Sequence, residues 1–428
     1  MTSETTQPAE VLVDHLFRNR AGQMVAYLTR VLGPKNIDLA EEVVQESLLK
    51  ALQVWPYSGI PDNPAGWLFR VARNAALDAL RHRTMADQKS EEIVSDISRR
   101  QSVATLVDDE ILEDQLRDDE LRMVLMCCHP SLSPDARVAL SLKTVGGFST
   151  REIARAFLSD ETTIAQRIVR AKRQIRESNV SFDLPSGSDL SLRLESVMEV
   201  IYLMFNEGYA AQEGEDLVRQ DLCGEALRLG QLLATSRVTT PQAHALVSLM
   251  AFQAARLPAR VDQSGEMVLL EDQDHRLWDP KLIALGFHHF TASAEGDSVS
   301  SYHIQAAISA VYAGTLRTGN IDWQRILGLY DQLMEISPSP VVALNRAVAV
   351  SKIDGPEAAL AALRPLTEDR TLRNYHLLPA VRGRFLLDLG DREAAADCFR
   401  QALDRPCSEP EKRFLSRKLN ECHRTEPI

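Results

Sequence analysis

Apolar residues recur at every third or fourth position along almost all of this 428-residue chain, which is the spacing of helices that bury one face. The alternation of apolar and polar residues that marks a strand appears weakly and only in residues 265–272. The sequence therefore predicts an all-α fold. A chain of this length exceeds one ordinary domain, so several helical domains are expected.

Interruptions of the helical pattern place the domain boundaries. Proline, glycine and serine gather in residues 56–64 and again in 179–189, and such clusters form loops. We expect two small helical domains over residues 10–84 and 121–180, with an acidic linker between them over residues 85–120. A larger helical domain is expected over residues 186–428.

The last part of the chain, from about residue 338 to 428, shows a faint internal repeat. Gly355 and Gly390 each precede an alanine-rich amphipathic run. Near the second glycine, several small and apolar residues follow the pattern of a tetratricopeptide repeat (TPR), namely Leu387, Ala395, Phe399, Ala402 and Leu403. We therefore expect TPR-like helical hairpins there.

Charge is segregated along the chain, although the formal net charge is −12. Residues 66–83 hold four arginines and one acid, and residues 149–177 hold seven bases and four acids. Between these modules, residues 85–120 hold twelve acids and four bases. Two basic modules around an acidic linker favour selective contact with nucleic acid over an indiscriminate coat.

The first basic module reads as one amphipathic helix. Its predicted buried face holds Leu68, Val71, Ala72, Ala75 and Ala79. Its opposite face holds Trp67, Arg70, Arg73, Asn74 and Arg81. Arginines can bind phosphates and an exposed indole can stack on an unpaired base, so this face is a candidate DNA surface. An ordinary solvated face with a buried Trp67 is the alternative.

The preceding helix carries an acidic face. Its predicted inward stripe is Ala40, Val44, Ser47, Leu48, Ala51 and Trp55. A second face holds Glu41, Glu42, Gln45, Glu46 and Leu49. This acidic face with one leucine is a candidate docking surface for a basic partner, with a plain solvated stripe as the alternative.

The second basic module predicts a helix-turn-helix. Ser149 and Glu152 form a capping-box pattern that begins one helix, with Ile153, Ala154 and Phe157 on its buried face, and Asp160 can cap the next. In the second helix Ile164, Ile168, Ala171 and Ile175 face inward. The candidate DNA contacts are Thr162, Thr163, Gln166, Arg167, Arg170, Lys172 and Arg173. A helical hairpin without DNA binding is the alternative.

Three blocks in order, "LAEEVVQESLLKALQVW", "PAGWLFRVARNAALDALRHR" and "STREIARAFLSDETTIAQRIVRAKRQI", resemble regions 2 and 4 of extracytoplasmic-function (ECF) sigma factors of the sigma-70 family. The rest resembles a subgroup with a TPR-like C-terminal extension. The resemblance implies core RNA polymerase and promoter DNA as partners. It places polymerase docking on the acidic face, the proximal promoter element on the Trp67 helix and the distal element on residues 162–173. It also implies that the acidic linker lies along basic polymerase channels.

The C-terminal extension is expected to bind a protein or to fold back on the sigma domains and regulate them, since paired helices form grooves for helices and peptides. Two other classes remain open. One is a helix-turn-helix regulator with a TPR-like sensor that does not use polymerase. The other is an enzyme in the tail, for which the acidic run "EDQDHRLWDP" lacks the converging ligands and placed base of a metal or hydrolytic site. We expect no enzyme activity.

The remaining features indicate a cytoplasmic protein without cofactor or metal. The start, "MTSETTQPAE", lacks a signal-peptide pattern, and no apolar run is long enough to cross a membrane. The six cysteines show no C-x-x-C spacing and are expected to be reduced, mostly buried thiols. Cys127, Cys128 and His129 could in principle bind metal or sense oxidation, but no further ligand stands at a useful spacing.

Overall fold

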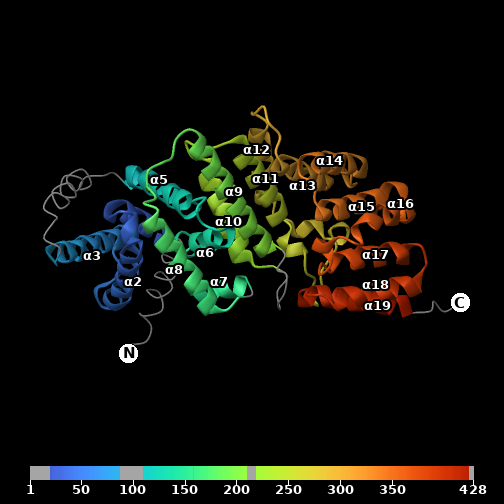
Figure 1. Ribbon diagram of the computed structural model, residues 1–428, viewed down its shortest axis with the longest axis horizontal. Helices are drawn as coiled ribbons and strands as arrows, with labels where there is room; N and C mark the ends of the chain where they lie inside the picture. Colours follow the sequence, from blue (N-terminus) through green and yellow to red (C-terminus); the bar gives the residue numbers. More distant parts are fainter. Residues whose placement is uncertain (1–19, 87–108, 158, 210–217, 424–428) are drawn as a thin grey trace. The chain divides into compact units, whose positions relative to one another are not determined.

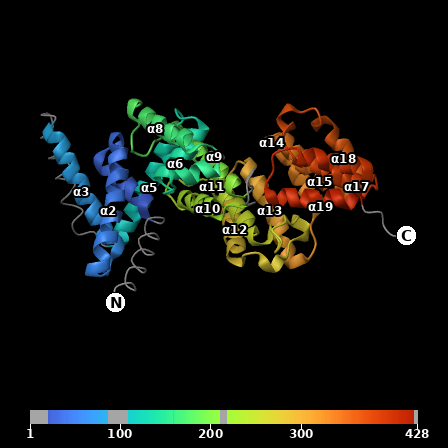
Figure 2. The same ribbon diagram turned by 90° about the horizontal axis from the view of Figure 1, so that it is seen from below.

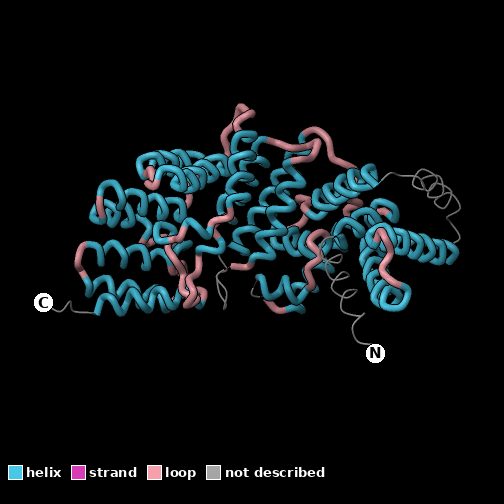
Figure 3. The backbone as a smooth tube through the Cα atoms, turned by 180° about the vertical axis from the view of Figure 1, so that it is seen from behind, coloured by secondary structure: helices cyan, strands magenta, loops and turns pink. Residues whose placement is uncertain are grey.

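The regular structure of this protein is helical, as the sequence predicts. A computed structural model describes residues 20–86, 109–157, 159–209 and 218–423, and Figures 1 and 3 show helices joined by loops in these ranges. The nearest approach to a strand among the described residues is one isolated antiparallel bridge between Val261 and Met267. The weak alternation in residues 265–272 therefore forms no strand.

The chain divides into two compact units, Met1–Val200 and Ile201–Ile428, called here the N-terminal unit and the C-terminal unit. The N-terminal unit contains a helix that includes residues 20–32, followed by η1 (Pro34–Asn36), α2 (Ile37–Ser58), α3 (Pro64–Ala86), α5 (Asp109–Cys127), α6 (Pro134–Thr144), α7 (Thr150–Ala156), α8 (Glu161–Glu177) and the first part of α9 (Ser188–Tyr209). The boundary between the units falls inside α9, later than the predicted boundary at 186.

Helices α2 and α3 pack side by side, as both views of the ribbon show (Figures 1 and 2). The predicted inward stripe of α2, from Ala40 to Trp55, is buried. The predicted stripe of α3 is only partly right, because Leu68 and Ala72 are buried while Val71, Ala75 and Ala79 are half-buried. The buried stripe instead includes Phe69, Ala76 and Leu77.

The rotation of the α3 stripe has a visible cause. The Phe69 ring meets the Tyr27 ring edge-on at a centroid distance of 6.0 Å, so α3 contacts the helix of residues 20–32 in addition to α2. A helix held from two directions buries a face between its two neighbours. Periodicity alone does not reveal the second neighbour.

Helices α6, α7 and α8 pack together around the second predicted basic module. The capping box that begins α7 is confirmed, because Ser149 Oγ accepts from the Glu152 amide at 3.1 Å and Glu152 Oε2 accepts from the Ser149 amide at 2.8 Å. Such a cap stabilises a helix by about 1 kcal/mol. The predicted inward residues of α8, Ile164, Ile168, Ala171 and Ile175, are all buried. On α7, Ile153 and Ala154 are buried as predicted, and Phe157 is half-buried.

The predicted acidic linker is partly a packed helix. Residues 87–108 lie outside the described residues, but α5 begins at Asp109. Asp119 accepts a hydrogen bond from Arg30 Nε at 2.8 Å, and Glu120 accepts one from Gln23 Nε2 at 3.2 Å. Both acids are buried, so they are part of the packed N-terminal unit and are not exposed as a tether would be.

The C-terminal unit is a succession of helix pairs (Figure 2). After the last part of α9 come α10 (Gln220–Ala234), α11 (Pro241–Ala254), η2 (Leu257–Ala259), η3 (Leu270–Asp272), η4 (His275–Leu277), α12 (Pro280–Ser293), α13 (Ser301–Thr318), α14 (Trp323–Ile336), α15 (Pro340–Asp354), α16 (Pro356–Leu363), η5 (Arg364–Leu366), η6 (Arg370–Leu372), α17 (Leu377–Asp388), α18 (Arg392–Leu403) and α19 (Glu409–His423). Consecutive helices contact one another from α10 to α19.

The two glycines singled out by the repeat pattern sit at helix junctions. Gly355 and Gly390 have φ angles of 87° and 83°. Residues other than glycine rarely adopt this backbone conformation. Helix α16 starts directly after Gly355, and α18 starts two residues after Gly390. The apolar residues of the second run, Ala395, Phe399 and Ala402, are buried in one cluster with residues of α19. Helical hairpins are thus confirmed there, and their assignment to the TPR family stays a prediction.

Candidate nucleic-acid interface

The acidic face of α2 is exposed, with one exception. Glu42, Gln45 and Glu46 are exposed, and the Leu49 side chain has 57% of its surface in solvent. Glu41 is half-buried because it faces α8. The helix therefore presents an acidic surface around one leucine, which is the composition that a basic partner with an apolar spot would contact.

The arginine face of α3 is also exposed in most positions. Arg70, Asn74 and Arg81 are exposed and Arg73 is half-buried. The Arg81 guanidinium pairs with Asp78 at 3.2 Å, as expected for neighbours one turn apart.

Trp67, at the start of this face, is only half-buried. Its ring meets the buried Trp55 ring edge-on, with centroids 5.5 Å apart. This position combines the two readings of the sequence, since one side of the indole packs on the core and part of its surface remains free.

Helix α8 presents a polar and basic surface. Thr162, Thr163, Gln166, Arg170 and Arg173 are exposed, as the helix-turn-helix pattern predicts. Arg170 donates to Gln166 Oε1 at 3.3 Å, and Arg173 pairs with Glu177 at 2.7 Å. Arg167 is half-buried and lies 3.7 Å from Asp135 of α6. Exposed pairs of this kind are weak, so the guanidinium groups can exchange these partners for phosphates or base edges.

Lys172 is not on the exposed flank where the sequence places it. Only 6% of its surface is exposed, and its Nζ lies 2.9 Å from Asp38 Oδ1 and 2.8 Å from Glu41 Oε2 on α2. Burial alone would lower the pKa of Lys172, but the two carboxylates hold it above its ordinary value. The ammonium group therefore stays charged and ties α8 to α2.

Asp38 belongs to this contact, although it was not among the residues predicted from the sequence. It also accepts a hydrogen bond from Arg176 of α8. Burial opposes ionisation of Asp38, yet Lys172 and Arg176 together lower its pKa. The position of Asp38 one helical turn before Glu41 was the only hint in the sequence that the two carboxylates share a face. Their partners could not be foreseen, because Lys172 and Arg176 lie more than a hundred positions further along the chain.

The cysteine pair before Pro130 is structural. Cys127 and Cys128 are fully buried, and their Sγ atoms contact Thr144 Oγ1 at 3.2 Å and Ser141 Oγ at 3.6 Å. Burial raises the pKa of Cys128 to about 12, so this thiol stays protonated at neutral pH. All six cysteines are buried, as expected. No cluster of three or more His, Cys, Asp or Glu within the described ranges could hold a metal ion.

The acidic run "EDQDHRLWDP" has structural roles as well. Asp279 caps α12 by accepting from the amides of Lys281 and Leu282. Asp274 accepts from the Arg276 amide and pairs with its guanidinium at 2.7 Å. Glu271 pairs with Lys352 and Arg384 of the later helices. These acids therefore have partners within the protein and do not converge on a shared ligand.

Comparison with known sequence families places these surfaces in two known modules. Residues 16–85 match the family described as Sigma-70 region 2, and residues 122–175 match Sigma-70, region 4. Residues 193–294 match a family of unknown function, DUF6596. The first match covers α2 and all of α3 but its last residue, and the second covers α8 up to Ile175. The acidic face of α2 and the basic faces of α3 and α8 therefore belong to sigma-type modules.

Comparison with individual proteins agrees. An uncharacterized protein of Rhizobium meliloti (strain 1021) is 40% identical over 387 residues, which is 90% of each chain. The probable ECF RNA polymerase sigma factor SigI of Mycobacterium tuberculosis is 27% identical over 169 residues, covering 40% of this chain and 56% of its own. The ECF RNA polymerase sigma-E factor of Salmonella typhimurium is 28% identical over 134 residues, covering 31% of this chain and 70% of its own.

The chain belongs to the ECF class of the sigma-70 family of RNA polymerase sigma factors. No solved structure matches the chain. None of the described helices combines the length and apolar character that a membrane crossing requires.

Proposed function

We propose that this protein binds core RNA polymerase, directs initiation at a specific set of promoters and is modulated by its own C-terminal unit. One observation supports the proposal above all others. The N-terminal unit exposes an acidic face on α2 and basic faces on α3 and α8, and both lie in segments that match sigma-70 regions. A protein that holds a large enzyme and a duplex together needs both signs of charge, kept apart.

In this proposal α2 docks on the polymerase. Glu42, Gln45 and Glu46 supply charge and hydrogen bonds, and Leu49 supplies the apolar contact. Glu41 takes part from the edge of the face, where it also holds Lys172. The half-exposed leucine at the centre of a polar rim has the anatomy of a binding hot spot.

Promoter DNA is proposed to contact two helices. Trp67, Arg70, Arg73, Asn74 and Arg81 of α3 bind the proximal element, where an aromatic ring and arginines suit a strand that is being separated. On α8, Thr162, Thr163, Gln166, Arg170 and Arg173 read the distal element in the major groove, with Arg167 at the edge. Lys172 can reach a phosphate only by leaving Asp38 and Glu41, so we assign it a positioning role between α2 and α8.

The C-terminal unit is proposed to act on this machinery as a binding module, through a protein partner or through contact with the sigma modules. In this scheme the chain itself catalyses no reaction, and the polymerase supplies the chemistry. The segment that matches the family of unknown function and the hairpins after it would report a signal to the N-terminal unit. The acids of residues 87–108, which lie outside the described residues, remain candidates for contact with basic polymerase channels.

The decisive experiment is reconstitution of the full chain with core RNA polymerase, followed by run-off transcription on fragmented genomic DNA. We expect a stable assembly with core polymerase, and we expect the transcripts to start at sites whose upstream DNA shares common promoter elements. A matched truncation should end after Tyr209, because a cut at 186 would remove Arg193, which donates to the Leu125 carbonyl at 3.0 Å inside the N-terminal unit.

The outcomes separate the hypotheses. Failure of both the full chain and the truncated chain to bind core polymerase would reject the sigma-factor proposal and favour a helix-turn-helix regulator with a sensor domain. Binding of both forms with equal affinity and equal transcription would retain the sigma factor and reject modulation by the C-terminal unit.

A further inference from the structure

The C-terminal unit contains a cavity of about 500 Å³, which is within the usual size range for small-molecule sites. Its wall is formed by residues from the end of α9, the end of α11, and α13, α14, α15, α17 and α19. The segment of residues 261–278 contributes the stretch from Met267 to Glu271 and Gln273. None of the sigma modules takes part in this wall.

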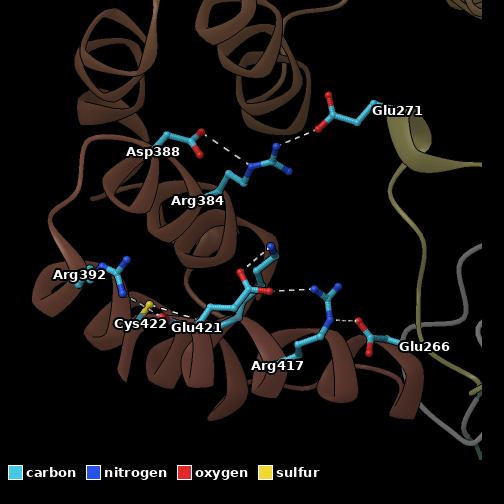
Figure 4. A network of polar contacts seen from close by, with 9 residues as sticks. Glu266, Glu271, Arg384, Asp388, Arg392, Arg417, Glu421 and Cys422 are labelled. Carbon is cyan, nitrogen blue, oxygen red and sulfur yellow. Dashed lines mark hydrogen bonds and ion pairs between the residues drawn. The ribbon is translucent and has the colours of Figure 1, made fainter. Parts of the chain in front are cut away.

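Ion pairs fix the 261–278 segment over the later helices. Glu271 pairs with Lys352 of α15 and lies 2.9 Å from Arg384 of α17. Figure 4 shows Arg384 between Glu271 and Asp388, and Arg417 reaching Glu266. The segment is therefore a fixed part of the wall, so the cavity is formed before any ligand arrives.

The charges that line the cavity do not balance. Lys352 and Arg384 are paired with Glu271, and Asp388 also faces Arg384. The third carboxylate of the wall, Glu411, faces His376 at 3.2 Å and accepts from Ser408. These pairs leave Arg256 and Arg260, neither of which forms an ion pair with a carboxylate among the described residues, although Glu411 is near enough to favour the charged form of Arg260.

Arg256 is buried and Arg260 is half-buried. Arg256 is 8% exposed, and its only side-chain hydrogen bond within the described ranges goes to the Tyr209 hydroxyl at 3.1 Å. The Arg260 guanidinium lies 3.9 Å from the centre of the Tyr209 ring and donates to the Tyr209 carbonyl. Two neighbouring guanidinium groups in a low-dielectric site are costly without a counter-charge, so an anion that pairs with them would be bound strongly.

Further polar groups point to a ligand. Gln273 is 8% exposed and lines the cavity, and its Oε1, a hydrogen-bond acceptor, is buried without a partner, so it would accept from a donor on the body of the ligand and not from the anionic head. Tyr312 and Tyr330 also belong to the wall, and burial raises the pKa of Tyr330 to about 12, so its hydroxyl remains a donor at neutral pH. The wall also has neutral polar residues, such as Ser309 and Asn345, and an apolar part that includes Leu269, Ile308, Val348, Val381, Phe385 and Leu415.

We propose that this cavity is a binding site for a small organic anion, in which Arg256 and Arg260 hold a carboxylate or phosphate head and the apolar wall receives the rest of the molecule. Arginine pairs suit both heads, because each offers two oxygens to the planar fork. This site goes beyond the proposed role in transcription and does not depend on it.

The test uses the full chain and 1-anilinonaphthalene-8-sulfonate, an aromatic sulfonate that fluoresces in apolar surroundings. We expect one saturable site per chain that octanoate, phenyl phosphate or both displace, while 1-octanol and octylamine do not. Displacement by octanoate alone assigns a carboxylate ligand, and displacement by phenyl phosphate alone assigns a phosphate. Trp323, which lines the cavity, gives a second readout through its change in fluorescence.

Three variants complete the test, and a thermal melt checks the folding of each. The double variant Arg256→Gln with Arg260→Gln should weaken probe binding at least tenfold, while Arg276→Gln, an exposed arginine paired with Asp274, should leave it unchanged. Val348→Phe keeps both arginines and narrows the cavity, and it should also weaken binding. Unchanged binding in folded forms of the double variant or of Val348→Phe would overturn the proposal, and so would equal displacement by 1-octanol.

Discussion

Charged side chains are arranged in opposite ways in the two units. In the N-terminal unit, Glu42 and Glu46 on α2 and Arg170 and Arg173 on α8 lie exposed on outward faces. In the C-terminal unit, Arg256 is buried, Arg260 is half-buried, and both line a cavity. Exposed charges act on large partners over several ångströms and are screened by salt, whereas buried charges select one counter-charge at short range.

This contrast assigns different kinds of partner to the two units. An exposed face suits DNA and the surface of a polymerase, because many weak contacts add up over a wide area. A cavity suits a small molecule, because desolvation makes each contact strong. Lys172, Asp119 and Glu120 are exceptions in the N-terminal unit, since each is buried and has its partners within the protein.

The largest effect is expected when the exposed charges of α8 are removed. Arg170→Ala combined with Arg173→Ala should lower binding to a promoter fragment by about 100-fold, because each arginine contact with DNA contributes roughly 1–3 kcal/mol. Fluorescence anisotropy of the polymerase holoenzyme on that fragment measures this, and the salt dependence should become shallower.

Arg117→Ala is the matched control, since Arg117 is exposed on α5, outside the proposed DNA faces. Equal losses in the control and the double variant would mean that general charge, and not the α8 face, binds DNA.

Removal of the buried Lys172 ammonium group should lower the stability of the fold more than it weakens DNA binding. Lys172→Met leaves Glu41 half-buried without its partner, and we expect the free energy of unfolding to fall by about 2 kcal/mol, less than for a fully buried pair because Asp38 is more than half exposed. Urea unfolding of the full chain measures this change. Arg176→Met removes the more exposed contact to Asp38 and should cost less than 1 kcal/mol. Equal costs would assign no special role to the burial of Lys172.

A histidine pair in the C-terminal unit predicts a dependence on pH. His289 is buried, and its Nδ1 lies 2.8 Å from Nδ1 of His244. Burial, together with His244 and His288, lowers the pKa of His289 to about 4. Between pH 6.5 and about 4 the unfolded chain binds a proton that the folded chain excludes, so stability falls as the pH is lowered.

We expect a loss of about 2 kcal/mol between pH 7 and pH 4.5 from His289. Chemical unfolding at a series of pH values measures the slope, which should be smaller in His289→Gln. The exposed neighbour His288 supplies the control, because His288→Gln should keep most of the slope. The opposite ranking of the two variants would contradict a neutral buried pair.

The smallest effect is expected on the acidic face of α2. Leu49→Asp should weaken binding to core polymerase about tenfold, the loss of one apolar contact of roughly 1.4 kcal/mol. Biolayer interferometry with immobilised core polymerase measures it. Tyr57→Asp, on the same helix and 92% exposed, should bind normally. A tenfold loss in both would show that added charge, and not the Leu49 contact, weakens docking.

The predictions that succeeded needed only the spacing of residues within short segments of the chain. The inward residues of α2 and α8 and the capping box at Ser149 follow from spacings of three and four residues, because a helix fixes which side chains share a face. The charged faces of the N-terminal unit are therefore visible in the sequence.

Errors arose wherever a second neighbour decided the outcome. The α3 stripe is turned toward Phe69 because Tyr27 packs against it. Part of the predicted linker is the helix α5, because Arg30 and Gln23 pair with its acids. The residues within one helical turn of these positions do not indicate that Tyr27, Arg30 or Gln23 packs against them.

The amino-acid order alone established an all-α protein with sigma-type modules and segregated charge, since helix periodicity and motif spacing are properties of short segments. The burial of Lys172 and the cavity around Arg256 and Arg260 became visible only in the folded chain. Both depend on residues that are far apart in sequence, and the environment of a charge, which decides whether it binds DNA, a neighbour or a ligand, is set by those distant residues.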